Sequence, residues 1–199
     1  ADVPDVTAIL GAAKLSGKMA GWSVGLLEAV TAKEEARYLD TSDVAQRFAV
    51  EPRSNYAVAR ARRELRGGQT FVGAVATAVN RQLDSDPLAA TLRSAAYAGG
   101  VDFRHEWANR SWVVYGDAET SDVRGTPAAI TLTQRQPNHY FQRPDATHLG
   151  VDAAATSLVG YSVNAALGKQ AGLHWRGSVA AAATSPKYEV NDVGFSYRT

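Results

Sequence analysis

Residues 93–107 read RSAAYAGGVDFRHEW, and the turn residues ANR at 108–110 follow directly. Large apolar side chains alternate with charged ones along this stretch, an order with period two that predicts a β-strand with one apolar and one polar face. The apolar face holds Tyr97, Val101, Phe103 and Trp107, and the polar face holds Asp102, Arg104 and Glu106. The stretch is longer than the roughly five or six residues usual in soluble sheets, and it is long enough to cross a bilayer when tilted.

The same alternation recurs along the chain and predicts an all-β, antiparallel fold of about eight or nine long strands. We expect strands over Thr7–Leu15, Trp22–Thr31, Asn55–Leu65, Thr70–Arg81, Arg93–Trp107, Ser111–Asp122, Ser157–Lys169 and His174–Thr184, with a ninth starting near Asp192. Short turns, such as Ser16–Gly21 and residues 66–68, alternate with long connections, such as the charged stretch Ala32–Glu51 and the longest loop, residues 123–156. Up-and-down barrels of the outer membrane have short periplasmic turns and long extracellular loops, so the pattern predicts such a transmembrane barrel or a segment of one.

All four tryptophans lie beside the short turns, at positions Trp22, Trp107, Trp112 and Trp175. Tryptophan has a large apolar body and one N–H donor, and it concentrates where an apolar surface meets water at a membrane rim. We therefore expect these four residues to form the interface girdle at the periplasmic rim of the barrel.

Composition narrows the alternatives. The chain of 199 residues has no cysteine, so it has neither disulfides nor thiolate metal sites. It holds no run of about 18 apolar residues, which leaves a β-barrel as the only way to span a membrane. A net charge of +1 gives no general attraction to nucleic acid. Because the strand pattern starts and stops abruptly at both ends, we interpret residues 1–199 as one barrel region that is either a piece of a larger protein or a processed form.

The polar faces supply candidates for the lumen of the barrel: Arg60, Arg62, Glu64, Asp102, Arg104, Glu106 and Arg176. These residues could line a pore or bind a solute. They could also neutralise one another in a polar interior, which we favour because buried charges need partners. Glu28 is an exception, since it shares an apolar face with Trp22. Either it lies above the apolar band or a bulge shifts the register.

The longest loop contains a helix signal, with Thr126 as N-cap and Pro127 at the first helical position. Its second half carries a group of aromatic and polar residues, His139, Tyr140, Phe141 and Arg143. This group could bind a sugar or form a lid, or it could pack the loop onto the rim or plug the lumen. No metal-ligand spacing, nucleophile motif or phosphate loop occurs, so we expect no enzyme, no cofactor and no metal site.

Several runs together resemble a known family: ILGAAKLSGK at 9–18, VTAKEEARY at 30–38, DFRHEWANR at 102–110, YFQRPD at 140–145 and YEVNDVGF at 188–195. The chain resembles the barrel region of an uncharacterised family of large bacterial envelope proteins. In that family a domain similar to family-9 carbohydrate-binding modules precedes a C-terminal outer-membrane barrel. The resemblance implies an outer-membrane location and a link to carbohydrate, but it carries over no catalytic residue.

The sequence thus predicts a bacterial outer-membrane β-barrel that serves solute passage or surface binding, with carbohydrate as the favoured class. Its partners would be the lipid bilayer, a carbohydrate or other small solute, and missing strands or other envelope subunits. The alternative is a non-membrane structural or adhesive β-protein of a cell-surface assembly.

Overall fold

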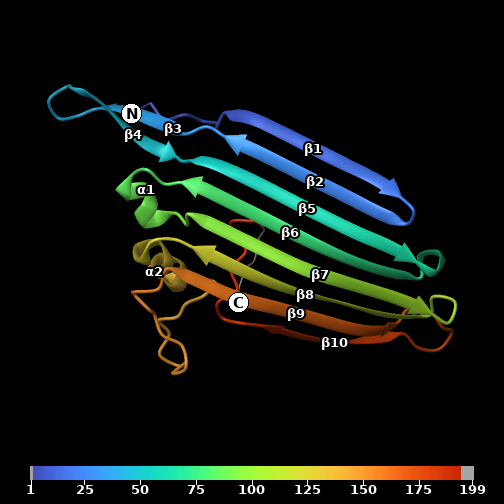
Figure 1. Ribbon diagram of the computed structural model, residues 1–199. Coiled ribbons are helices and arrows are strands. Elements are labelled where there is room, and N and C mark those ends of the chain that lie inside the picture. Colours follow the sequence, from blue (N-terminus) through green and yellow to red (C-terminus); the bar gives the residue numbers. More distant parts are fainter. Residues whose placement is uncertain (1, 194–199) are drawn as a thin grey trace.

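The fold is built around one long antiparallel sheet. The computed structural model describes residues 2–193. Eight strands pair in the order β1-β2-β5-β6-β7-β8-β9-β10, each with its neighbour along the sheet (Figure 1). Their bounds are β1 Ile9–Met19, β2 Trp22–Thr31, β5 Arg53–Leu65, β6 Thr70–Gln82, β7 Ala95–Trp107, β8 Trp112–Arg124, β9 Ser157–Lys169 and β10 Gly177–Thr184. The expected all-β antiparallel fold is confirmed, but the sheet does not close, and β1 and β10 are its two edges.

The two ends of the sheet differ. Short turns join the strands at one end, while the long connections and both helices, α1 (Asp86–Thr91) and α2 (Pro127–Arg135), lie at the other (Figure 1). The first short turn is tighter than expected, because Ala20 and Gly21 both adopt positive φ, at 50° and 80°. Two such residues make the turn that suits a two-residue hairpin. The predicted turn over Ser16–Gly21 was therefore wrong at its start, and β1 runs on to Met19.

The charged stretch that was expected to be a loop contains a second, two-stranded sheet. β3 (Glu34–Leu39) pairs with β4 (Ala45–Glu51). The carboxylate of Asp40 accepts hydrogen bonds from the N–H groups of Ser42 and Val44, at 2.8 and 3.0 Å, and so holds the hairpin turn. The many charges hid this hairpin because most of its side chains are exposed and show no apolar face.

The register places large apolar side chains such as Leu26, Val101, Phe103 and Val163 on one face, the apolar face, and the charged side chains of Arg60, Arg62, Asp102 and Arg104 on the other, the polar face. The buried core lies on the polar face, where Ala96, Val123 and Leu158 pack against Ile130 of α2 and Phe141. α2 begins as expected, with the Thr126 hydroxyl accepting a hydrogen bond from the Ala129 N–H at 3.3 Å. The apolar face, in contrast, stays exposed: Val101 is 58 %, Tyr161 55 % and Val163 42 % accessible.

Two expected elements near the C-terminus differ from the prediction. β10 begins at Gly177, so His174, Trp175 and Arg176 lie in the connection before it. The predicted ninth strand falls mostly outside the described residues, and within them Asn191–Val193 form a turn.

Candidate functional site

The polar face carries ion pairs between strands. Arg60 of β5 pairs with Asp102 of β7, although β6 runs between these two strands. The pair passes over Gly73 of β6, where an added Cβ would lie 2.6 Å from a carboxylate oxygen of Asp102 and 2.7 Å from an Arg60 nitrogen. Gly73 thus has no side chain because the ion pair occupies that space.

The other lumen candidates also have partners. Arg104 donates to Glu106 at 2.7 Å, and Lys18 lies 3.7 Å from Glu64. Arg62 lies over the ring of Phe71, 4.1 Å from its centroid. The exception is Arg176, which is exposed and lies outside the strands. Apart from Arg176, the set expected on a polar face does lie there, and mutual pairing describes it better than a row of free charges.

A segment after β10 covers part of the polar face, and the sequence did not predict it. Residues 185–193, which we call the strap, follow β10 and cross the face toward β6. At its start, the Ser185 N–H donates to the Tyr161 carbonyl of β9 at 2.8 Å. In its middle, the Glu189 N–H donates to Ser121 Oγ of β8 at 2.9 Å. At its far end, Asp192 pairs with Arg81 of β6 at 2.8 Å.

The backbone of the strap lies directly on β9. An added Cβ at Gly160 would overlap the backbone of Tyr188. The Tyr188 hydroxyl donates to Glu119 of β8. Burial and this hydrogen bond to a carboxylate raise the pKa of Tyr188, so the phenol stays protonated and remains a donor.

Glu189 anchors the middle of the strap to the loop after α2. Its carboxylate accepts from His139 Nε2 at 2.8 Å and from Asn138 Nδ2 at 3.2 Å, and both the His139 and Glu189 side chains are fully buried. The other ring nitrogen of His139 lies 2.8 Å from the Pro186 carbonyl. Burial raises the pKa of Glu189, but the hydrogen bonds from His139 and the Asn191 N–H and the nearby Arg93 outweigh it and lower the pKa to about 2.

Asp192 anchors the far end of the strap. Its carboxylate pairs with both Arg81 and Arg93, and all three side chains are nearly buried, with 7–15 % accessibility. Arg93 also donates to Thr133 Oγ1 of α2 at 3.0 Å. The strap, α2 and the ends of β6 and β7 are therefore held together by one charged cluster.

The lowered pKa of Glu189 predicts how the strap responds to acid. A carboxylate with a depressed pKa stabilises the folded state above its ordinary pKa of about 4.5, and this stabilisation is lost as the pH falls toward 2. We expect wild-type protein to be more stable than Glu189→Gln at pH 7, and the difference to shrink between pH 4.5 and 2. Denaturant unfolding at several pH values measures it, and a difference that does not change with pH would contradict the buried pair.

Gly160 tests the contact between strap and sheet. We expect Gly160→Ala to cost about 1–3 kcal/mol and to displace the strap, because the new methyl group overlaps its backbone. Hydrogen exchange of the amides in 185–193 should speed up in this variant. Gly25→Ala is the matched control. Gly25 of β2 lies on the polar face of the sheet, as Gly160 does, but no atom lies within 4 Å of an added Cβ there. Equal exchange in the two variants would contradict the docked strap.

The candidate loop residues fall into two groups. His139 and Phe141 are buried, 4 % and 2 % accessible, and their rings pack edge to face at 5.7 Å. These two residues pack the loop onto the sheet, which is the packing alternative given above for this group. Tyr140 is exposed, and Arg143 lies 4.0 Å from Asp145.

The apolar face has an aromatic and basic border at the short-turn end. The rings of Trp107 and Trp112 stack at 6.1 Å, and Trp175 packs edge-on against Trp112 at the same distance. Lys169 Nζ lies 3.9 Å from the Trp175 ring centroid, and Arg63 lies 5.2 Å from that of Trp22. All four tryptophans thus lie at this end of the sheet, where the sequence analysis placed them.

A polar border lies at the opposite end of the same face. Asn55 donates to Glu28 at 3.1 Å, and the Tyr97 hydroxyl donates to Asn80 at 2.6 Å. The pairing of β2 with β5 is regular, so no bulge moves Glu28 to the other face. Glu28 lies at the edge of the apolar surface, where its charge is hydrogen-bonded and accessible to water.

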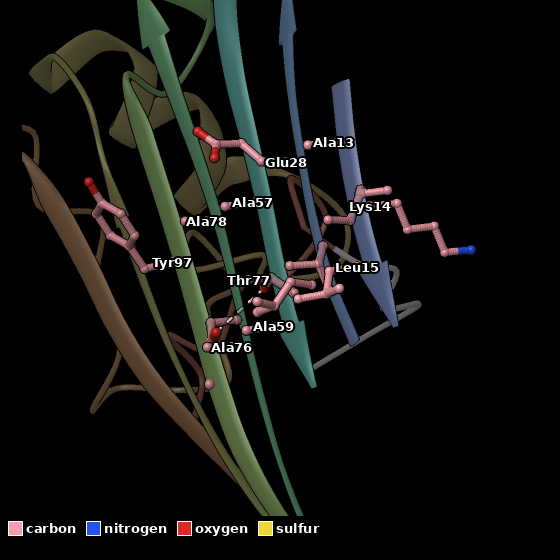
Figure 2. Close-up of a pocket in the computed structure, with 15 residues that line it drawn as sticks. Ala13, Lys14, Leu15, Glu28, Ala57, Ala59, Ala76, Thr77, Ala78 and Tyr97 are labelled. Atoms are coloured by element: carbon pink, nitrogen blue, oxygen red, sulfur yellow. Dashed lines mark hydrogen bonds between the residues drawn. The ribbon is translucent and has the colours of Figure 1, made fainter. Parts of the chain in front are cut away.

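A shallow groove of about 740 Å³ lies against β1, β2, β5, β6 and β7. Alanines of β5 and β6 line the middle of the groove. Larger side chains of the strands beside them, such as Leu15 of β1 and Tyr97 of β7, line its two sides (Figure 2). The alanines are Ala57, Ala59, Ala76 and Ala78. In the groove, the side chains of β5 and β6 on this face are thus small, and the larger side chains belong to the neighbouring strands.

Among residues 2–193 no group of three or more His, Cys, Asp or Glu side chains is placed to hold a metal ion. No helix of the described chain is both long and apolar enough to cross a membrane.

These features define a class: an antiparallel all-β protein with a broad sheet that is exposed on its apolar side and partly covered on its polar side by α2 and the strap. The chain belongs to the family described as a domain of unknown function, DUF5916, whose model matches residues 1–199. No curated protein and no solved structure matches it.

The residues that sequence reasoning missed are Gly73, which lies under the Arg60–Asp102 ion pair, and those of the strap and its partners: Arg81, Arg93, Gly160, Tyr188, Glu189 and Asp192. The run YEVNDVGF was noticed only as part of a resemblance. Its one physical signal is two carboxylates in a short segment after an apolar strand, which predicts no particular partner.

Proposed function

We propose that this chain forms part of the wall of a bacterial outer-membrane β-barrel, with the apolar face toward lipid and the polar face toward the lumen. The observation that carries the proposal is the placement of the covering elements. α2 and the strap pack on the polar face, while the large apolar side chains of the other face remain exposed. A soluble protein rarely leaves so broad an apolar surface uncovered.

The dimensions of the apolar face agree with a bilayer. On β8 it extends from Trp112 at one border to Asp122 at the other, about 33 Å at roughly 3.3 Å per residue. A strand tilt of about 40° reduces this to a height of about 25 Å, the usual height of the apolar band in outer-membrane barrels. The aromatic border and the polar border would then lie at the two water interfaces.

We further propose that the complete barrel contains more than these eight strands. The interior of an eight-stranded barrel has room for side chains only, whereas a helix with its side chains is about 10 Å wide. Here α2 and the strap both lie on the inward face, so β10 cannot close directly onto β1 around them. Both edge strands would instead pair with further strands of the same protein or of envelope subunits.

The function of such a barrel would be solute passage or surface binding. Paired charges on the inner face suit a polar, water-filled lumen, and the strap narrows it. Carbohydrate is the proposed solute class because of the resemblance to envelope proteins that carry a domain similar to family-9 carbohydrate-binding modules.

Reconstitution tests this proposal. We expect the full-length protein to fractionate with the outer membrane, to need detergent for extraction, and to let small sugars enter vesicles that contain it. Membrane association without sugar entry would leave surface binding as the function. Recovery in the aqueous phase without detergent would overturn the proposal.

A second candidate is a non-membrane structural protein of a cell-surface assembly. The two unpaired edges, β1 and β10, favour it, because exposed edge strands readily pair with other chains. This candidate predicts detergent-free assemblies whose apolar faces are packed against one another.

A further inference from the structure

The ionisable side chains of the apolar face are distributed unevenly between its two borders. On the strands, the acidic residues of this face are Glu28 and Asp122, and both lie at the long-loop end. On this face the short-turn end carries the cations Arg63 and Lys169 and no carboxylate on its described strands, whereas the long-loop end also carries the cations Arg53 and Arg124. Within residues 2–193, neither Arg63 nor Lys169 forms an ion pair with a carboxylate.

Both cations are held beside tryptophan rings. Arg63 lies over Trp22, and Lys169 lies against Trp175 with Trp112 at 5.9 Å. In such a contact the cation lies over the face of the ring, and the ring does not occupy all of its N–H donors, so the remaining donors can still bind an anion. Tryptophan at a membrane interface lies at the depth of the headgroups, and a cation packed on it lies at the depth of the phosphates.

The opposite border carries charges of both signs, and its carboxylates are bound by neighbouring residues. Arg124 pairs with Asp122 at 2.6 Å, and Glu28 and Tyr97 bind the amides of Asn55 and Asn80. The two borders therefore differ in their carboxylates and their rings. The long-loop border holds Glu28 and Asp122 beside its cations, whereas the described strands carry no carboxylate at the short-turn border, where both cations lie on tryptophan.

We propose that the short-turn border of the apolar face binds the headgroups of anionic phospholipids in the adjoining leaflet, with Arg63 and Lys169 as the phosphate-binding residues. This inference rests on the proposed membrane location. The inference adds a preference of the protein for anionic lipids, and it gives an energetic reason for the orientation of the sheet in the membrane. Each cation near an anionic surface favours binding by about fivefold.

Tryptophan fluorescence provides the test, since all four tryptophans of residues 1–199 lie at this border. Any tryptophan outside these residues is first replaced by phenylalanine, so that the emission reports this border alone. The full-length protein is placed in phosphatidylcholine vesicles that contain either brominated phosphatidylglycerol or brominated phosphatidylcholine. Bromine on the acyl chain quenches a nearby indole. We expect the anionic lipid to quench at a several-fold lower mole fraction, and the preference to weaken in 0.5 M salt.

The variant Arg63→Gln/Lys169→Gln should lose most of the preference. The control Lys14→Gln/Arg47→Gln removes the same two kinds of charge from positions off the apolar face, and it should keep the preference. Equal quenching by the two lipids in wild-type protein would overturn the headgroup site and leave the membrane location intact. Quenching by neither lipid would overturn both.

Discussion

Val163→Arg should lower the free energy of unfolding of the full-length protein in a bilayer by about 2–4 kcal/mol. This is the cost of an arginine on the lipid face near the middle of the membrane. Val163 lies in the middle of β9 on the apolar face, with 42 % of its surface exposed. In a soluble protein an exposed valine tolerates arginine with little change in stability. The large expected loss therefore comes from lipid and not from packing.

The neighbouring residue supplies the control for this prediction. Asn164 points to the opposite face, where it donates to Asp117 at 2.8 Å. An arginine at 164 would meet a carboxylate and water, so Asn164→Arg should change the free energy of unfolding by less than about 1 kcal/mol. Urea unfolding from vesicles measures both variants. Equal effects at 163 and 164 would contradict the assignment of the two faces.

Asp192→Ala should cost about 3–5 kcal/mol, because it leaves Arg81 and Arg93 nearly buried without their carboxylate. The loss should be accompanied by release of the strap, since within residues 2–193 Asp192 forms the only ion pairs at its far end. Limited proteolysis of the folded protein should then cut within residues 185–193, and denaturant unfolding gives the free-energy change.

Asp145→Ala is the matched control for that cluster. Asp145 is exposed, and its pair with Arg143 spans 4.0 Å, so its removal should cost about 0–1 kcal/mol. If Asp192→Ala were no more destabilising than this control, the strap would not be docked in the folded protein.

Much of the sheet could be predicted from the sequence because each long strand carries its own alternation. β2 and β9 begin and end at the predicted residues, Trp22–Thr31 and Ser157–Lys169. The position of the tryptophans beside short turns likewise predicted that all four lie at the same end of the sheet. Such signals are local, since they depend on residues next to one another in the chain.

The strap could not be predicted in this way. Arg93 and Asp192 are 99 residues apart, and neither lies in a pattern that names the other as its partner. Gly73 and Gly160 are also ordinary in the sequence, and their importance comes from atoms of other strands that fill the space beside them. The β3–β4 hairpin was missed for a related reason, since exposed strands show no apolar alternation.

The central claim is that the apolar face contacts lipid and the polar face does not. Single nitroxide labels placed in turn at residues 159–167 of β9 test it most directly, in the full-length protein reconstituted in vesicles. We predict a period of two, with labels at Val159, Tyr161, Val163, Ala165 and Leu167 accessible to oxygen, which is enriched in the bilayer, and shielded from a water-soluble nickel reagent. Labels on this face that are accessible to the nickel reagent, or shielded from both reagents, would contradict the account.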